Sequence, residues 1–337
     1  MKSKVILTGI TTTGTPHLGN YVGAIRPAVE ASRVENNRSF YFLADYHALV
    51  KNQNPERFRQ STLEVSAAWL ALGLDTDKSI FYRQTDIPEI MELTWILMCM
   101  TAKGLMNRAH AYKALVTENE KKRAGDPDKG ISMGLFCYPV LMAADILMFK
   151  ANEVPVGKDQ FQHLEMARDI AGRFNHIFGD TFVLPAAVTD TKTAVLKGLD
   201  GLKMSKSYDN TIPLFASEKK LRKLIMKIKT NSQGPEEPKD PKTCTLFETY
   251  QAFATKEEVL AMKARYTTGI AWGEMKQILF EYLNDQLAEP RRRYRSLIEN
   301  SEYIENVLKE GAEKARAHSV PFLAEIRKKI GVQTIGG

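Results

Sequence analysis

Residues 4–20 have the sequence KVILTGITTTGTPHLGN, and the order of elements in this segment sets the fold class. Lys4–Ile10 is a short run with several β-branched residues, as is typical of a strand. Thr11–Pro16 is rich in turn-forming residues, and a helical pattern follows from about His17 to Val34. The segment therefore predicts a strand, a tight turn and a helix, in that order.

The same order recurs through the first half of the chain. Further strands are predicted at Ser39–Asp45, Ser79–Tyr82 and Val154–Val156, with a polar loop at Lys121–Gly130. Helices are predicted at Glu56–Leu72, Pro88–Met100, Ala102–Val116, Gly134–Phe149 and Asp159–Phe178. This alternation predicts an α/β fold with a Rossmann-like, doubly wound parallel sheet, in which ligands bind beyond the carboxyl ends of the strands.

Strand patterns disappear near residue 216. The rest of the chain is helical in period or composition, at Leu221–Ile228, Lys256–Arg265, Trp272–Leu287, Arg291–Ile298 and Ile304–Lys329. We therefore predict two domains, a Rossmann-like domain with a helical insertion over residues 1–215 and an all-helical domain over residues 216–337.

The composition excludes several classes of protein. Of the 337 residues, 44% are hydrophobic and 26% are charged, which excludes disordered, collagenous and disulfide-scaffold proteins. The longest apolar run, Tyr138–Phe149, is too short to cross a bilayer and contains Asp145, and we find no signal peptide. Cys99, Cys137 and Cys244 lie far apart, as suits reduced thiols in the cytosol. We expect a cytoplasmic protein that has no membrane contact.

The net charge of +7 permits an RNA partner, and most of the basic excess lies after residue 216. A soluble basic protein would explain that charge equally well. Two basic stretches, Lys219–Lys223 and Arg291–Arg295, could contact an RNA backbone or face solvent.

Two segments far apart in the sequence suit a polyphosphate. At the first turn, a helix N-terminus offers backbone N–H groups, Gly14 and Gly19 allow close approach, and His17 and Asn20 can donate hydrogen bonds. The second segment, Lys203–Ser207 or KMSKS, carries two lysines and two hydroxyls that can close on phosphates. Taken singly, the first could be an ordinary strand-to-helix turn and the second a solvated loop.

Together these segments resemble the two signature sequences of class I aminoacyl-tRNA synthetases, with His17–Asn20 in place of the H-I-G-H-type motif. Further segments resemble tryptophanyl-tRNA synthetases of the bacterial type, and they are Tyr138–Leu147, Val154–Gln160, Gln162-His163, Ala44–Leu49 and Gly311–Arg316. The resemblance extends over residues 4–331. It implies that ATP activates tryptophan to tryptophanyl-adenylate with release of pyrophosphate. The 2′-hydroxyl of the terminal adenosine of tRNA(Trp) then accepts the tryptophanyl group.

One face of the predicted helix over residues 134–149 suits an indole ring. Tyr138, Met142 and Asp145 are spaced four and three residues apart, so they share a face. A thioether adapts to a flat ring, and a carboxylate can accept one N–H. Met142 could equally be core, whereas a carboxylate within an apolar run needs a partner.

The resemblance implies that Asp145 accepts the indole N–H, and that Tyr138 and Gln160 contact the ammonium and polar end of tryptophan. It also implies a lining formed by Leu7, Gly9, His47, Met142, Val154 and Val156. Phenylalanine lacks the N–H group and would leave Asp145 unpaired, so we expect strong selectivity with no editing domain.

The resemblance further implies which residues bind ATP, and Mg²⁺ accompanies ATP rather than occupying a metal site of the protein. The expected ATP-binding residues are Thr11, Thr12, Thr13, His17, Gly19, Asn20, Gly157, Asp159, Lys203, Met204, Ser205, Lys206 and Ser207. Lys203, Lys206 and Lys113 are expected to stabilise the developing charge, although Lys113 could equally be a surface lysine.

Two positions depart from the pattern of many relatives. Thr11 stands where they carry a glutamine directed at the substrate's carboxylate end, and Leu7 stands where an aromatic residue is often found. We expect both departures to alter the contacts that the first strand makes with tryptophan.

The resemblance also implies that residues 216–337 bind the anticodon, and that the protein is a homodimer in which one tRNA touches both subunits. Three alternatives remain at this point. A tyrosyl-tRNA synthetase would share fold, size and both signatures. A small-molecule nucleotidyltransferase would share the first turn, and a non-catalytic RNA-binding relative would lack ATP binding.

Overall fold

The computed structural model describes residues 4–35, 37–123, 125–157, 160–188, 195–332 and 334. Within these residues, five parallel strands form one sheet in the order β3-β2-β1-β4-β5. The strands are β1 (Lys4–Ile10), β2 (Asn37–Leu43), β3 (Ser79–Arg83), β4 (Glu153–Pro155) and β5 (Ala186–Val188). The chain order reverses between β1 and β4, which is where doubly wound sheets bind ligands. The predicted α/β fold class is confirmed.

Helices cover both faces of the sheet. On one face, residues of α2 (Arg26–Ser32) and α4 (Pro55–Ala71) share a core with Tyr41 of β2 and Phe81 of β3. On the other face, α5 (Pro88–Met100), α8 (Met133–Met148) and α9 (Phe161–Phe178) share a core with Phe40 and Phe42. Because successive side chains of β2 and β3 point to opposite faces of the sheet, they pack into two separate cores, one on each face.

The helical part has its own core, built from α10 (Glu218–Met226), α11 (Thr245–Phe253), α12 (Lys256–Thr268) and α13 (Trp272–Gln286). Leu18 of the short helix α1 (Leu18–Asn20) and Met204 belong to this same core. The two segments that the sequence predicts to bind phosphate thus both pack against the helical part.

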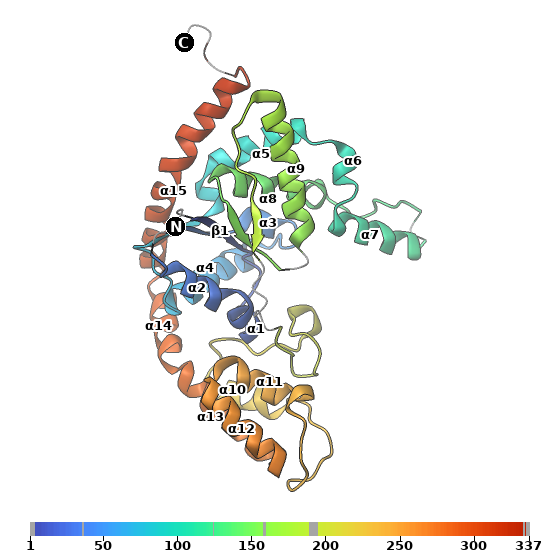
Figure 1. The fold of residues 1–337 in the computed structure, drawn as a ribbon, viewed down its shortest axis with the longest axis vertical. Coiled ribbons are helices and arrows are strands. Elements are labelled where there is room, and N and C mark those ends of the chain that lie inside the picture. The colour runs from blue at the N-terminus through green and yellow to red at the C-terminus, as the bar shows by residue number, and fades with distance from the viewer. Residues whose placement is uncertain are drawn as a thin grey trace.

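The last two helices, α14 (Ala288–Glu299) and α15 (Ser301–Lys329), return along one side of the α/β part (Figure 1). Gly311 allows α15 to lie directly against β3, because a Cβ at this position would stand 1.7 Å from the carbonyl oxygen of Phe81. Residues of α15 belong to the cores on both faces of the sheet. The division into domains at residues 1–215 and 216–337 stays a prediction. The last helix, α15, contributes residues to the two cores of the α/β part.

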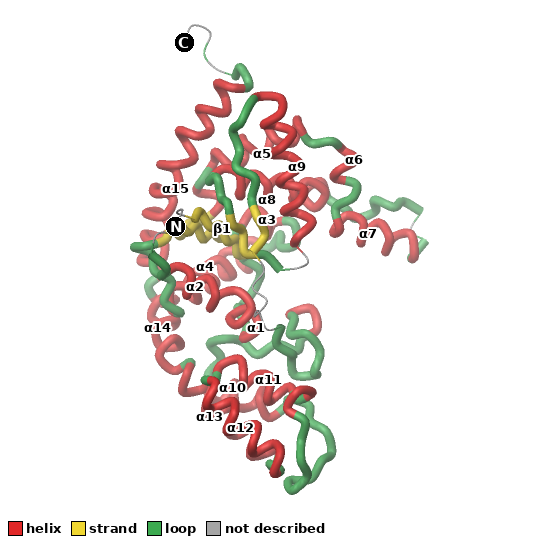
Figure 2. Tube along the Cα trace, viewed as in Figure 1, coloured by secondary structure: helices red, strands yellow, loops and turns green. Residues whose placement is uncertain are grey.

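Figure 2 shows the strands gathered in the middle of an elongated molecule, with helices above and below them. The helical insertion contains α6 (Lys103–Met106) and α7 (His110–Lys121), and α7 projects away from the body of the molecule (Figure 1). None of the helices among the described residues has the length and apolar character needed to span a bilayer.

The predicted single helix over Ala102–Val116 is wrong, because the structure has two helices there. The Gln162 side chain explains the break. Its Oε1 accepts from the N–H of His110 at 2.7 Å, and its Nε2 donates to the carbonyl of Arg108 at 2.9 Å. A side chain from α9 therefore replaces the hydrogen bonds that a continuous helix would make. β5 and α11 were not predicted from the sequence.

Candidate active site

A cavity of about 710 Å³ lies at the carboxyl ends of β1 and β4. Its size is within the range of small-molecule sites, roughly 300–1,000 Å³. The residues predicted to contact tryptophan all line it, and they are Leu7, Gly9, His47, Tyr138, Met142, Asp145, Val154, Val156 and Gln160. The structure thus brings together side chains from β1, α3 (Asp45–Leu49), α8 and β4 at the point where the strand order reverses.

The carboxylate of Asp145 is buried and already has two partners from the protein. His47 Nε2 lies 2.8 Å from Oδ2, and Gln84 Nε2 donates to Oδ1 at 2.7 Å and to Oδ2 at 2.9 Å. Burial raises the pKa of Asp145, whereas the hydrogen bonds and charge of His47 and the amide of Gln84 act against that rise. The expectation that phenylalanine would leave this carboxylate unpaired is therefore wrong.

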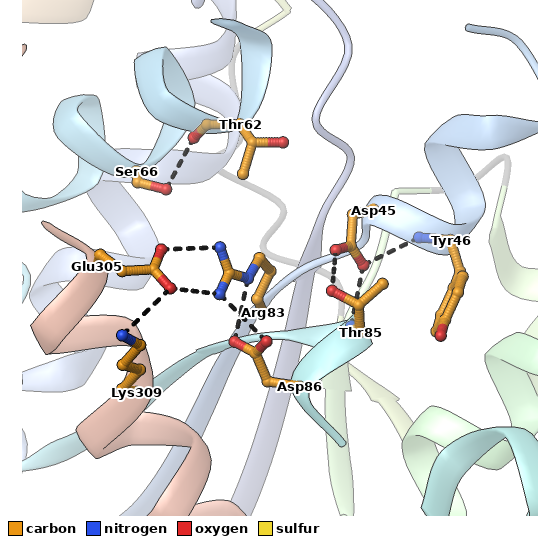
Figure 3. A network of polar contacts seen from close by, with 9 residues as sticks. All are labelled: Asp45, Tyr46, Thr62, Ser66, Arg83, Thr85, Asp86, Glu305 and Lys309. Atoms are coloured by element: carbon orange, nitrogen blue, oxygen red, sulfur yellow. Dashed lines mark hydrogen bonds and ion pairs between the residues drawn. The ribbon is translucent and has the colours of Figure 1, made fainter. Parts of the chain in front are cut away.

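Gln84 is held in place by the turn that follows β3. The side chain is fully buried, and its Oε1 accepts from the N–H of Tyr46 at 3.1 Å. Asp45 accepts from the same N–H and from the hydroxyl of Thr85 at 2.5 Å, as Figure 3 shows. The start of α3, which carries His47, and the turn Gln84–Asp86 are thus fixed to each other.

A second network secures the same turn from the other side. Arg83 makes two hydrogen bonds of 2.9 Å to Glu305 of α15 and two of 3.0 and 3.1 Å to Asp86 (Figure 3). The paired geometry suits a guanidinium, and it ties the carboxyl end of β3 to the last helix. The structure therefore links α15 to the turn that carries Gln84.

Behind the cavity, a buried histidine joins two of its lining residues. His163 of α9 is 2% exposed, and its Nε2 lies 2.6 Å from the hydroxyl of Tyr138. Its Nδ1 lies 2.9 Å from Oε1 of Gln160. Tyr138 and Gln160 line the cavity, whereas His163 does not.

At the first turn, His17 and Asn20 form a capping box. Nδ1 of His17 accepts from the N–H of Asn20 at 3.2 Å, and Oδ1 of Asn20 accepts from the N–H of His17 at 3.1 Å. Burial, followed by the nearby charge of Lys206, lowers the pKa of His17 to about 4. The ring is therefore neutral near pH 7, and because Nδ1 accepts, the proton is on Nε2.

The loop at Lys203–Ser207 lies against this turn, although about 190 residues separate them in sequence. Nζ of Lys206 donates to the carbonyl of Thr13, and the side chain also approaches Gly14. Gly14 has a φ of +68°, and a Cβ there would stand 3.3 Å from that ammonium. Burial lowers the pKa of Lys206; the charge of Arg57 acts in the same direction, and that of Glu64 opposes it.

The loop is held from within by Asn210, which is 2% exposed. Its Oδ1 accepts from the N–H of Ser205 at 2.8 Å, and its Nδ2 donates to Asp200 at 2.8 Å and to the carbonyl of Lys203 at 3.1 Å. Gly198 makes room for it, because a Cβ there would stand 2.4 Å from the side chain of Asn210. A single amide thus fixes the backbone of Lys203 and Ser205.

Comparison with known proteins shows the family to which the chain belongs. The model of the family described as class I tRNA synthetases (W and Y) matches residues 2–288. A tryptophan–tRNA ligase from Pseudomonas aeruginosa is 58% identical over 334 residues, which are 98% of this chain and 74% of that protein. The tryptophan–tRNA ligase of Neisseria meningitidis is 55% identical, covering 99% of this chain and 100% of that protein. The chain belongs to the class I tryptophanyl-tRNA synthetases.

A solved structure supports the same family. It is the tryptophanyl-tRNA synthetase from Campylobacter jejuni complexed with ADP and tryptophan, which has a TM-score of 0.87 at 43% identity. The alignment covers 97% of this chain and 99% of that chain. These similarities favour the tryptophan-specific members over the tyrosyl, nucleotidyltransferase and non-catalytic alternatives that the sequence left open.

Only some of the other residues that the sequence assigned to ATP line the cavity of this synthetase. Thr11, Thr13 and Gly157 line the cavity, whereas Thr12 does not and is fully buried. Asp159 lies outside the described residues. Gly19 leaves room for the ring of His17, because a Cβ there would stand 3.1 Å from it and 3.5 Å from Cβ of Met204.

Lys113 lies on the exposed surface of α7, two residues after Ala111, which lines the cavity. No residue of α7 is buried. Within the described part of the chain, no three His, Cys, Asp or Glu side chains lie together in a group that could hold a metal ion.

Of the basic stretch Arg291–Arg295, two members already have carboxylate partners. Arg292 and Arg293 both pair with Glu289, while Arg291 is 8% exposed and donates to Asn284 at 2.9 Å. Arg291 is therefore buried between helices and is not part of a solvent-facing RNA surface.

Reasoning from the sequence missed Gln84 and Asn210 as parts of the site, and it treated His163 only as part of a matching string. Gln84 directly follows β3, so a polar residue at the carboxyl end of a buried strand was the available signal. Asn210 and His163 offered none, because their partners lie on segments whose positions only the fold determines.

Proposed function

We propose that this synthetase binds tryptophan in the cavity between β1, β4 and α8, with the indole N–H directed at Asp145. The observation that carries the proposal is a buried carboxylate that borders a mostly apolar cavity. An ionised carboxylate can accept about four hydrogen bonds. His47 and Gln84 each direct one nitrogen at it, that of Gln84 being shared between both oxygens, so acceptor capacity remains for a single further N–H donor.

In this arrangement, phenylalanine binds less well than tryptophan mainly because it lacks one hydrogen bond, the one from the indole N–H to Asp145. His47 and Gln84 already make hydrogen-bond contacts to the Asp145 carboxylate before any substrate arrives. An N–H donated to a charged acceptor contributes roughly 1.5–3 kcal/mol, which corresponds to a factor of about 10–100. The poorer fit of a smaller ring in a cavity shaped for indole adds to that factor.

At the polar end of the substrate, Tyr138 and Gln160 would receive the ammonium group. Thr11 lines the same cavity but is shorter than a glutamine, so we expect a contact from the first strand to the carboxylate to be indirect or absent. That leaves the substrate carboxylate free to face the α-phosphate of ATP.

ATP would lie over the turn that carries His17 and Asn20, with Gly157 and Asp159 beside its ribose and Met204 at its adenine. The proton on Nε2 of His17 makes this side chain a neutral donor to a phosphate oxygen. Thr13, Gly19, Ser205 and Ser207 complete the proposed ATP contacts, whereas Thr12 is fully buried and is not among them. Mg²⁺ would enter with ATP and share the charge of its phosphates.

In the first step, the tryptophan carboxylate attacks the α-phosphorus in line, the bond to the bridging oxygen breaks, and pyrophosphate leaves with that electron pair. The protein forms no covalent bond, so its contribution is positioning and stabilisation of charge. Lys203 and Lys206 would stabilise the leaving pyrophosphate. Lys113 would join them when α7 approaches the cavity.

In the second step, the 2′-hydroxyl of the terminal adenosine of tRNA(Trp) attacks the carbonyl carbon of the adenylate, and AMP leaves. The helical domain at residues 216–337 would bind the anticodon. One tRNA would then contact both subunits of a homodimer.

The homodimer proposal rests on an exposed apolar face of α5. Met91 and Trp95 are spaced four residues apart, and their exposed fractions are 42% and 65%. A second copy of the chain would cover this face, since an exposed tryptophan on a helix is typical of an interface.

Amino-acid-dependent ATP–pyrophosphate exchange tests the proposal. Purified protein should support exchange with tryptophan and not with tyrosine or phenylalanine at the same concentration. Exchange driven equally well by tyrosine would refute the placement of the indole against Asp145. Adding tRNA(Trp) to the tryptophan reaction should yield charged tRNA.

A further inference from the structure

We propose that His163 is a positioning residue that fixes the direction of the hydrogen bonds at the polar end of the tryptophan site. The inference depends on the proposed placement of the substrate ammonium at Tyr138 and Gln160. It concerns a residue that does not line the cavity and that the sequence named only as part of a segment resembling the family.

The geometry shows one imidazole ring between two cavity residues. Nε2 lies 2.6 Å from the Tyr138 hydroxyl, and Nδ1 lies 2.9 Å from Oε1 of Gln160. The rings of Tyr138 and His163 meet edge to face with centroids 4.9 Å apart. His163 is 2% exposed, so the ring is packed as well as hydrogen-bonded and has little freedom to turn.

The chemistry of these partners determines where the protons lie. Oε1 of Gln160 can only accept, so Nδ1 of His163 carries a proton and donates it. In the neutral ring, Nε2 then accepts, and the hydroxyl of Tyr138 must be the donor in that bond. With its proton directed at His163, the oxygen of Tyr138 acts as an acceptor toward any further partner.

An acceptor is what an ammonium group requires, because an ammonium has donors and no lone pair. The opposite arrangement, with a proton on Nε2, would turn the Tyr138 hydroxyl toward the cavity as a donor. That hydroxyl would then oppose the ammonium and favour a carboxylate. His163 therefore sets the polarity with which Tyr138 meets the substrate, without touching the substrate itself.

A buried histidine with both nitrogens bonded could also be purely structural, and the test separates the two roles. The ligands are tryptophan, indole-3-propionate, which lacks the ammonium, and tryptamine, which lacks the carboxylate. Dissociation constants are measured by calorimetry for the wild type, His163→Met, His163→Gln and Tyr138→Phe. His176→Met, on the exposed surface of α9, is the matched control.

The decisive quantity is the ratio of the dissociation constant of indole-3-propionate to that of tryptophan. We expect Tyr138→Phe and His163→Met each to lower this ratio by about tenfold, the effect of one lost hydrogen bond to a charged group. His163→Gln, whose amide can still reach Tyr138, should give an intermediate ratio. Binding of tryptamine should weaken by the same factor as binding of tryptophan. His176→Met should leave all three dissociation constants unchanged. In pyrophosphate exchange, KM for tryptophan should rise much more than kcat falls.

One result would overturn the inference: His163→Met weakens the binding of all three ligands equally, while Tyr138→Phe still lowers the ratio. The role of His163 would then be structural only. An unchanged ratio in Tyr138→Phe would instead refute the proposed ammonium site. Should His163→Met fail to fold, His163→Gln alone decides: a lowered ratio supports the inference, and a wild-type ratio overturns it.

Discussion

At the scale of single residues, the buried amide of Gln84 holds the Asp145 carboxylate by both oxygens. We predict that Gln84→Met, which keeps the volume but removes the donor, raises KM for tryptophan in pyrophosphate exchange at least about tenfold. Without this donor, burial raises the pKa of Asp145 further and the carboxylate becomes a poorer acceptor.

The matched control is Gln251→Met, on the exposed surface of α11. It should leave KM for tryptophan at the wild-type value. A Gln84→Met enzyme that folds and has a wild-type KM would show that the amide does not position Asp145.

His17 leads to a prediction about pH. Its pKa is about 4 in the folded protein, compared with about 6.5 in an unfolded chain. Between these values the unfolded chain binds the proton more readily, so the free energy of unfolding decreases as the pH falls from about 6.5 towards 4. Above pH 6.5 the group makes no pH-dependent contribution.

Urea unfolding at pH 7, 6 and 5 measures this effect. His17→Asn retains a capping side chain but cannot take up the proton, so the stability difference between wild type and variant should shrink as the pH falls. The upper limit is about 1.4 kcal/mol per pH unit. His176→Asn should follow the wild type, and a difference between wild type and His17→Asn that is independent of pH would contradict the account.

The sequence was informative about residues whose role depends on local spacing. Tyr138, Met142 and Asp145 share a helix face by arithmetic alone, and all three line the cavity. It was uninformative about partners brought in by tertiary structure. The pairing of Asp145 with Gln84 joins residues 61 positions apart, and no periodicity links a helix face to the turn after a strand.

At the scale of elements, Gly311 determines how closely α15 packs on β3. We predict that Gly311→Ala destabilises the protein by more than about 3 kcal/mol, because the new methyl group would overlap the carbonyl oxygen of Phe81. Urea unfolding measures the change.

Gly172, in the exposed part of α9, is the matched control, because a Cβ there meets no atom within 4 Å. Gly172→Ala should stabilise the protein by roughly 0.5–1 kcal/mol through the better helix propensity of alanine. Equal effects of the two substitutions would show that α15 can shift away from β3 at little cost.

Element boundaries were predictable where they depend on local chemistry. The first strand and α5 have their expected ends, and α5 begins where Pro88 occupies the first helical turn. β5 has three residues and is stabilised only by pairing with β4, so its sequence carries too short a pattern. The break between α6 and α7 depends on Gln162, about fifty positions further along the chain.

At the scale of the whole molecule, the exposed face of α5 leads to a prediction about assembly. Trp95→Glu should convert a dimer to a monomer in analytical ultracentrifugation, because a charge would replace the largest apolar side chain of the proposed contact. Tyr303→Glu changes an aromatic side chain of 51% exposure on α15 and should leave the dimer intact. A Trp95→Glu protein that still sediments as a dimer would place the subunit contact elsewhere.

The sequence predicted the class of this molecule because an α/β order and two signature segments are local patterns. It could not show that the last helix returns to pack on the sheet. Its apolar spacing fits any partner surface, and the surface that it covers becomes visible only in the structure, where Gly311 lies opposite the backbone of Phe81 and Glu305 pairs with Arg83.

Selection of tryptophan by Asp145 is tested most directly by pyrophosphate exchange, in which Asp145→Ala is compared with the wild type for tryptophan and for phenylalanine. We predict that the ratio of kcat/KM for tryptophan to that for phenylalanine falls by about 10–100-fold, the contribution of one hydrogen bond to a charged acceptor. A variant that folds and retains the wild-type ratio would contradict the account, because the indole N–H would then be recognised elsewhere.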